Sequence, residues 1–255
     1  MSRIQELFKR KNKGILNVYV TAGYPSLHDT LPVMESLQEN GADMIELGMP
    51  YSDPLADGPV IQQSSARALS NGMTIRILFE QLRGFRERIK VPVILMGYMN
   101  PVLQYGFEKF CADAAAAGVD GLILPDLPEY EFETEYGAII RQYKLDFIFL
   151  VTPETSDERV KKLDSLSSGF LYAVSSSSTT GSAGGPGASE DYLLRLGFLG
   201  LQNPVLVGFG IHDKESFDRV ARFAAGGIIG TAFIRALEAG PDVNTSTKKF
   251  LSGLR

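Results

Sequence analysis

Short apolar runs alternate along the chain with longer segments whose apolar residues recur about every 3.6 positions. The apolar runs predict eight strands, at Leu16–Thr21, Met44–Leu47, Val93–Met96, Gly121–Leu124, Phe147–Val151, Phe170–Val174, Val205–Gly208 and Gly227–Ile229. The periodic segments between them predict helices, at Leu31–Glu39, Ile75–Ile89, Phe107–Ala117, Glu131–Tyr143, Ser156–Leu166, Tyr192–Leu199, Lys214–Ala224 and Thr231–Glu238. The strands are apolar throughout rather than alternating, which is typical of parallel strands that are covered on both faces.

Repeated strand–helix units without a linker predict an α/β protein, a single (β/α)8 TIM barrel over residues 1–255. A short extra N-terminal helix is expected before the first strand, with Ile4, Leu7 and Phe8 on one face. An open doubly wound sheet is the alternative. It is disfavoured because no Gly-x-Gly-x-x-Gly sequence opens a helix after the first strand.

Composition narrows the class of protein. The chain has 255 residues and a net charge of −5, which argues against binding to a nucleic-acid backbone. No run of 18 apolar residues indicates a membrane span. Cys111 is the one cysteine, so we expect no disulfide framework and a reducing, cytoplasmic location. His28 and His212 do not form a pattern typical of a metal site.

The segment Gly41–Pro59 carries the strongest chemical signal. Glu46 ends a predicted strand, and Asp57 follows on a loop that contains several prolines and glycines. A carboxylate at the end of an apolar strand is costly to bury unless it is paired or used. Two such groups at the carboxyl ends of barrel strands, where barrel enzymes have their active sites, favour acid–base chemistry. The alternative is a surface loop with helix-capping aspartates.

Glycine-rich segments follow the last three predicted strands, at Ser175–Gly187, Gly208–Ile211 and Gly230–Ala232. In TIM barrels, backbone N–H groups at these positions often bind a phosphate without any lysine or arginine. The sequence therefore predicts a phosphate site, the alternative being that the glycines only shape turns. The composition of Ser175–Gly187 also predicts a mobile lid over the site.

The run IELGMPYSDPLADGP at Ile45–Pro59 resembles the signature of the tryptophan synthase alpha subunit family. The resemblance extends over nearly the whole chain, through VTAGYP, LMGYMNP, LPDLP, TTG and GFGI. It implies a (β/α)8 carbon–carbon lyase of tryptophan biosynthesis that cleaves indole-3-glycerol phosphate to indole and glyceraldehyde 3-phosphate.

The resemblance also implies roles for individual residues. Glu46 is the expected acid–base group, and Asp57 is expected to face the indole nitrogen. The implied substrate-binding residues are Tyr172, Tyr19, Met96, Tyr98, Ile123, Leu150, Phe209 and Ile228. The implied phosphate-binding residues are Gly181, Gly210, Gly230 and Thr231. The apolar members of the first set could equally be packing residues of the barrel interior.

A partner is implied as well, the tryptophan synthase beta subunit, in an alpha2-beta2 complex that receives the indole. Asp53 is a candidate ion-pair donor to it. No cofactor is expected in this chain, with pyridoxal phosphate only in the beta subunit. The alternatives are a stand-alone lyase that releases free indole, another phosphosugar enzyme of the same fold, a non-catalytic barrel that activates a partner and, least favoured, a glycosidase.

Overall fold

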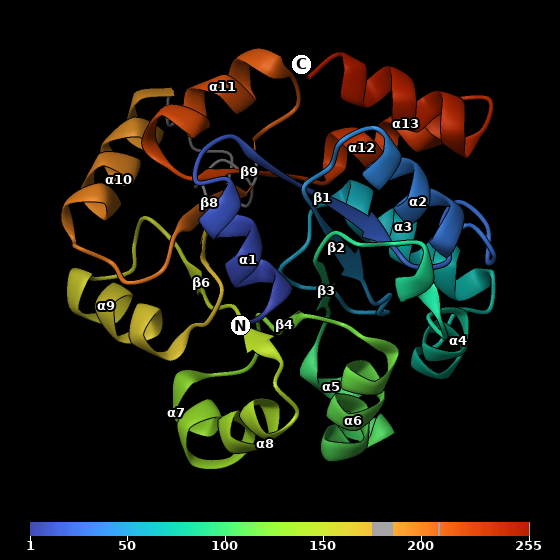
Figure 1. Cartoon of the computed structure of the whole chain (residues 1–255), viewed down its shortest axis with the longest axis horizontal. Coiled ribbons are helices and arrows are strands. Elements are labelled where there is room, and N and C mark those ends of the chain that lie inside the picture. The colour runs from blue at the N-terminus through green and yellow to red at the C-terminus, as the bar shows by residue number, and fades with distance from the viewer. Residues whose placement is uncertain (175–185, 209, 255) are drawn as a thin grey trace.

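The computed structural model describes residues 1–174, 186–208 and 210–254. Parallel strands form one sheet inside a ring of helices (Figure 1). The strand segments are β1 (Ile15–Thr21), β2 (Met44–Gly48), β3 (Val93–Met96), β4 (Gly121–Ile123), β5 (Asp146–Phe147), β6 (Leu150–Val151), β7 (Leu171–Val174), β8 (Val205–Gly208) and β9 (Gly226–Ile229). The helical segments are α1 (Arg3–Arg10), α2 (Thr30–Glu39), α3 (Pro59–Ser70), α4 (Ile75–Gln81), η1 (Phe85–Glu87), α5 (Met99–Tyr105), α6 (Phe107–Ala117), α7 (Glu129–Glu131), η2 (Phe132–Tyr136), α8 (Gly137–Gln142), α9 (Asp157–Leu166), α10 (Pro186–Phe198), α11 (Lys214–Phe223), α12 (Thr231–Ala239) and α13 (Val243–Ser252).

The sheet closes into a barrel. Its strand order runs from β5 through β4, β3, β2, β1, β9, β8 and β7 to β6. Its two end segments, β5 and β6, are separated in the chain only by Ile148 and Phe149. Ile148 donates a backbone hydrogen bond to Leu122 of β4, and Phe149 accepts one from Tyr172 of β7. The two segments are therefore parts of one barrel strand, and the predicted (β/α)8 barrel is confirmed.

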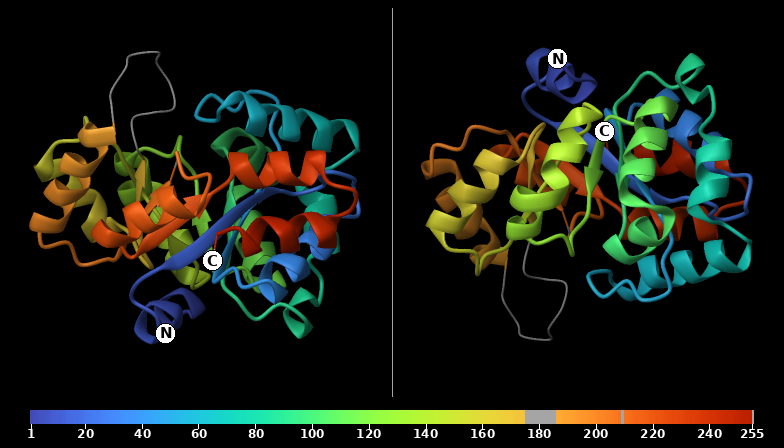
Figure 2. Two further views of the ribbon diagram at one scale, coloured as in Figure 1. Left: turned by 90° about the horizontal axis from the view of Figure 1, so that it is seen from above. Right: turned by 90° about the horizontal axis from the view of Figure 1, so that it is seen from below.

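The N-terminal helix covers the amino ends of the strands. Its Arg3 guanidinium pairs with Asp120, just before β4, at 2.9 Å. Phe8 packs against Phe170, just before β7, with ring centroids 6.2 Å apart. Figure 2 shows α1 and α3 on opposite sides of the sheet. Because α1 closes one end of the barrel, an internal site is expected at the other, where the carboxyl ends of the strands meet.

Several predicted boundaries were wrong. The strand expected at Phe147–Val151 is divided into β5 and β6. The helix expected at Ile75–Ile89 stops at Gln81, and Gly84, in the left-handed region at φ 69°, then begins the 3-10 turn η1. The helix expected at Glu131–Tyr143 is instead a succession of α7, the π-helical η2 and α8.

Three helices had not been predicted, namely α3, α5 and α13. The buried face of α3 consists of Ile61, Ser64, Ser65 and Ala68. These side chains are mostly small or polar, so the face lacks the bulky apolar period by which a buried helix is recognised. The helix is nevertheless fixed to the barrel, because the Ser64 hydroxyl lies 2.6 Å from that of Thr21 in β1.

Candidate active site

A cavity opens at the carboxyl ends of the strands, on the side of the barrel away from α1. The described residues that line it are Tyr19, Glu46, Asp57, Ile61, Met96, Tyr172, Gly210, Ile211, Ile228, Gly230 and Thr231. Strand register explains part of this set. Tyr19 of β1 pairs with Glu46 of β2, and pairing between parallel neighbours places both side chains on the same face of the sheet, here the interior.

Glu46 is held in the barrel wall with only 1% of its surface exposed. The side-chain amide of Asn17 donates a hydrogen bond to Glu46 Oε2 at 3.0 Å. Burial raises the pKa of Glu46 to about 8, an effect that the Asn17 hydrogen bond opposes and the nearby Asp57 charge reinforces. At neutral pH the group is therefore mostly a carboxylic acid, able to give a proton.

Asp57 reaches the cavity from the loop between β2 and α3. Its backbone N–H donates to Pro54 at 3.0 Å, which folds the loop back on itself. The Tyr98 hydroxyl donates to Asp57 Oδ2 at 3.1 Å, and the backbone N–H of Ala56 donates to the same hydroxyl at 3.1 Å. Burial raises the pKa of Asp57 to about 6, against the opposing effect of the Tyr98 hydrogen bond. Asp57 is therefore mostly ionised at neutral pH, while Glu46 is mostly protonated.

Two tyrosines occupy space that glycines leave open. A Cβ atom added at Gly48, the last residue of β2, would lie 2.1 Å from the Tyr19 hydroxyl oxygen. A Cβ atom at Gly208, the last residue of β8, would lie 2.1 Å from the Tyr172 hydroxyl oxygen. Burial raises the pKa of both tyrosines, so both remain neutral beside the two carboxyl groups. The glycines at these strand ends let both rings lie across the mouth of the barrel.

Another part of the cavity lining is suited to an anion. Gly230 and Thr231 stand at the start of α12, whose first turn has neither a capping side chain nor an acidic residue. The N–H groups of a helix start carry a partial positive charge and lack partners inside the helix. Gly210, at φ 78°, brings backbone to the same cavity. No lysine or arginine is among the described residues of this lining, so the anion would be bound by backbone N–H groups.

Most of the residues named from sequence come together here. Tyr19, Met96, Tyr172 and Ile228 line the cavity with both carboxyl groups and three of the four named phosphate-site residues. The remaining named positions divide into those near the cavity and those outside the described residues. Tyr98 touches Asp57 without being part of the lining, and Ile123 and Leu150 pair in register with Met96 and Tyr172 without reaching it. Gly181, Phe209 and most of the segment expected to form a lid lie outside the described residues.

Sequence reasoning missed Asn17, Ile61 and Ile211. Ile61 lies in the first turn of α3, the helix that the apolar pattern did not predict. Ile211 was predicted only as the last residue of the glycine-rich segment Gly208–Ile211 and not as part of the cavity lining. Asn17 is a polar residue in a mostly apolar strand. The register pairs it with Met44, and its hydrogen bond to Glu46, two residues further along β2, is seen only in the folded structure.

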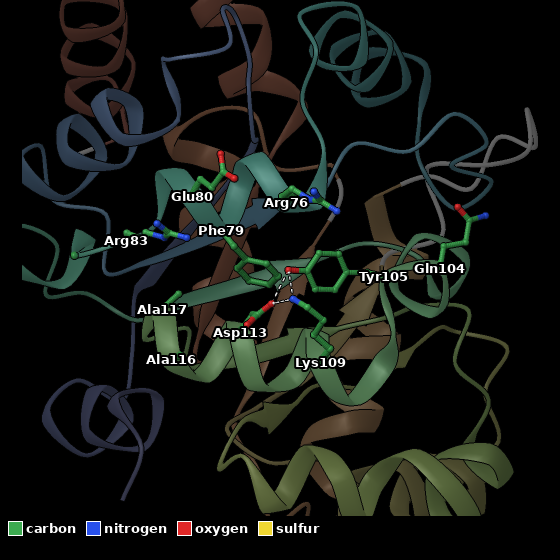
Figure 3. A pocket seen from close by; sticks show the side chains of 11 residues that line it. Arg76, Phe79, Glu80, Arg83, Gln104, Tyr105, Lys109, Asp113, Ala116 and Ala117 are labelled. Carbon is green, nitrogen blue, oxygen red and sulfur yellow. Dashed lines mark hydrogen bonds and ion pairs between the residues drawn. The ribbon is translucent and has the colours of Figure 1, made fainter.

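A second, larger cavity lies outside the barrel, between α4, α5 and α6 (Figure 3). Within it, the Tyr105 hydroxyl donates to Asp113 at 2.5 Å, and Lys109 pairs with both groups. None of the residues at the carboxyl ends of the strands lines this cavity. The two candidate acid–base groups, Glu46 and Asp57, line the cavity at the barrel mouth instead.

The described part of the chain offers neither a cluster of metal ligands nor a membrane-crossing helix. Nowhere in it do three or more histidine, cysteine, aspartate or glutamate side chains gather as a metal site would require. No helix there has both the length and the apolar character needed to cross a bilayer.

Comparison with known proteins gives the family. The model of the family described as tryptophan synthase alpha chain matches residues 5–252. The tryptophan synthase alpha chain of Flavobacterium johnsoniae is 53% identical over 238 residues, which cover 93% of this chain and 94% of that protein. The alpha chain of Parabacteroides distasonis is 46% identical over the full length of both proteins.

Solved structures agree with the sequence comparison. The crystal structure of tryptophan synthase subunit alpha from Legionella pneumophila superposes with a TM-score of 0.90 at 37% identity, covering 100% of this chain and 97% of that chain. A chain of the aminoacrylate-bound tryptophan synthase from M. tuberculosis gives 0.87 at 34% identity, covering both chains completely. The chain forms a closed barrel with Glu46 and Asp57 at its mouth and matches these proteins in both sequence and structure. It belongs to the tryptophan synthase alpha chain family.

Proposed function

We propose that Glu46 and Asp57 together carry the cleavage of indole-3-glycerol phosphate to indole and glyceraldehyde 3-phosphate. Family membership makes the chain a carbon–carbon lyase of tryptophan biosynthesis. The observation that supports the two roles is that both carboxyl groups line a single cavity. Burial raises the pKa of Glu46 to about 8 and that of Asp57 to about 6, which favours a protonated Glu46 beside an ionised Asp57 at neutral pH.

The cavity lining offers a surface for each part of the substrate. The start of α12 and Gly210 offer backbone N–H groups to the phosphate. Met96, Ile228 and the ring of Tyr19 offer apolar surface to the indole ring. Binding energy from the phosphate, which takes no part in bond breaking, would hold the reacting carbons beside Glu46.

In the reaction, Glu46 donates one proton to the substrate and later accepts one from it. Glu46 gives its proton to carbon 3 of the indole ring, which leaves a positive charge spread onto the ring nitrogen. The Asp57 carboxylate stabilises that charge and accepts the ring N–H. The ionised Glu46 then takes the proton of the adjacent hydroxyl group as its C–O bond becomes C=O. The electron pair of the breaking carbon–carbon bond returns to the ring, so indole leaves and Glu46 is again protonated.

Release of indole from indole-3-glycerol phosphate tests the roles of both residues. We expect Glu46→Gln and Asp57→Asn each to lower kcat by about two powers of ten or more, as loss of about 3 kcal/mol of transition-state stabilisation would. Glu80→Gln, on the exposed face of α4, is the matched control and should retain the wild-type rate. Full activity in Glu46→Gln or Asp57→Asn would remove that residue from the mechanism.

The partner and the cellular setting are part of the same proposal. The tryptophan synthase beta subunit would receive indole in an alpha2-beta2 complex, with pyridoxal phosphate in that subunit and no cofactor in this one. The loop Pro50–Pro59 is the proposed contact, because its Leu55 is 90% exposed and Asp53 is exposed beside it. We place the reaction in the cytoplasm. Asp53→Asn should weaken binding of the beta subunit without lowering the rate of the isolated chain.

A further inference from the structure

Asn17 is a buried polar residue in the middle of an apolar strand. It has no exposed surface and pairs in register with Met44 of β2 and Ile228 of β9. TIM barrel interiors are filled mainly by branched apolar side chains. An amide at such a position is costly unless its hydrogen bonds are made.

The amide meets only part of that requirement. Its Nδ2 donates to Glu46 Oε2 at 3.0 Å. Its Oδ1 is buried and has no hydrogen-bond partner among the described residues. A residue kept only for structure would be expected to satisfy both ends of its amide. The one hydrogen bond that the Asn17 side chain makes within the described structure goes to Glu46, the proposed acid, which indicates a role in the chemistry of that group.

The two oxygens of Glu46 are consequently not equivalent. Oε2 accepts the hydrogen bond from the Asn17 N–H. Oε1 accepts no hydrogen bond from any described residue, and it is not one of the buried oxygen atoms that lack a partner. In a carboxylic acid the carbonyl oxygen accepts hydrogen bonds better than the hydroxyl oxygen. The oxygen that accepts the amide N–H is therefore the carbonyl, and the proton resides on Oε1.

We infer that Asn17 is a positioning residue that directs the transferable proton of Glu46 to Oε1 and stabilises the carboxylate left after the transfer. This inference rests on the proposed role of Glu46 as the acid. The titratable groups that face Glu46 are Tyr19 from β1, Asp57 from the loop after β2, and Tyr172 from β7. None of them donates a hydrogen bond to Glu46 within the described structure, so none duplicates the amide.

Asn17→Leu tests the inference, because leucine keeps the branching of asparagine and removes the donor. A hydrogen bond to a charged group corresponds to about one to two pH units. The pH profile of kcat should therefore move its alkaline limb upward by about one pH unit. At pH 7, kcat should fall about tenfold with KM unchanged within about twofold.

A merely structural role would give a different result. It would lower kcat by the same factor at every pH and leave the alkaline limb where it is. Thr30→Val is the matched control, since it removes a buried hydroxyl that accepts the Gly23 N–H and lies outside the cavity lining. An unmoved limb in Asn17→Leu would overturn the inference.

A second measurement does not depend on the variant folding or on turnover. The side-chain amide of Asn17, assigned by through-bond correlation to its own backbone, is followed by 15N–1H NMR in the wild-type chain. It should shift with a midpoint near pH 8, the pKa of Glu46, and the shift should be absent in Glu46→Gln. An amide signal that is flat from about pH 6 to pH 9.5 would contradict the inference. A wild-type chain that releases no indole would instead defeat the proposed function and leave this result standing.

Discussion

Replacing Glu46 by glutamine should stabilise the folded chain, and the gain should grow with pH. The carboxyl has a pKa of 4.5 when unfolded and about 8 when buried. Stability from the raised pKa is fully present below pH 4.5 and is lost progressively as pH rises toward 8, because the unfolded chain releases the proton first. Because pH 7 is about 2.5 pH units above the unfolded pKa, burying Glu46 at that pH lowers the free energy of unfolding of the wild-type chain by about 3 kcal/mol. Above pH 8 the loss reaches about 5 kcal/mol.

Glutamine carries no charge in either state and can still accept the Asn17 hydrogen bond. Glu46→Gln should therefore gain roughly these amounts at pH 7 and pH 9, and almost nothing at pH 4.5. Urea denaturation followed by circular dichroism at the three pH values measures the difference. Glu80→Gln, the exposed control on α4, should change the free energy of unfolding by less than about 0.5 kcal/mol at each pH. A gain that is absent, or equal at all three pH values, would show that Glu46 is not a buried acid with a raised pKa.

The remaining predictions concern turnover of indole-3-glycerol phosphate. The rate should be bell-shaped in pH, because Asp57 must be ionised above about 6 and Glu46 protonated below about 8; a rate still rising at pH 9 would exclude Glu46 as the acid. Tyr98→Phe removes a donor to Asp57 and should move the acidic limb upward by about half to one pH unit; an unmoved limb would deny that contact a role. Gly210→Ala should raise KM several-fold with a smaller effect on kcat. Gly200→Ala also replaces a glycine of positive φ, but Gly200 lies outside the cavity lining, so this variant should leave KM unchanged. An equal rise of KM in both variants would count against the anion site.

Much of the barrel could be predicted because parallel strands covered on both faces are apolar throughout. Strands β3 and β8 have the expected bounds, as does α6, which ends before Gly118 at φ 98°. Helix α3 could not be found in this way, since its inward face includes Ser64 and Ser65. That helix is held by a tertiary contact to β1, and the periodicity of the sequence does not predict such a contact.

How much of the candidate site could be predicted from the sequence differs from residue to residue. The positions of Glu46 and Asp57, at a strand end and on a proline-rich loop, favoured acid–base chemistry, and the structure places both in one cavity. The apolar slot rested on family resemblance, and the structure places Met96 in the lining but not Ile123, one strand further round. Asn17 could not be assigned from sequence, because its contact with Glu46 depends on the register between β1 and β2.

The proposed mechanism requires Glu46 to be a carboxylic acid at neutral pH. Infrared difference spectra between the wild-type chain and Glu46→Gln, recorded from about pH 5 to pH 10, isolate the carbonyl band of this one protonated group. We expect a band that is present at pH 6 and disappears with a midpoint near pH 8. A group already ionised at pH 6 would contradict this expectation.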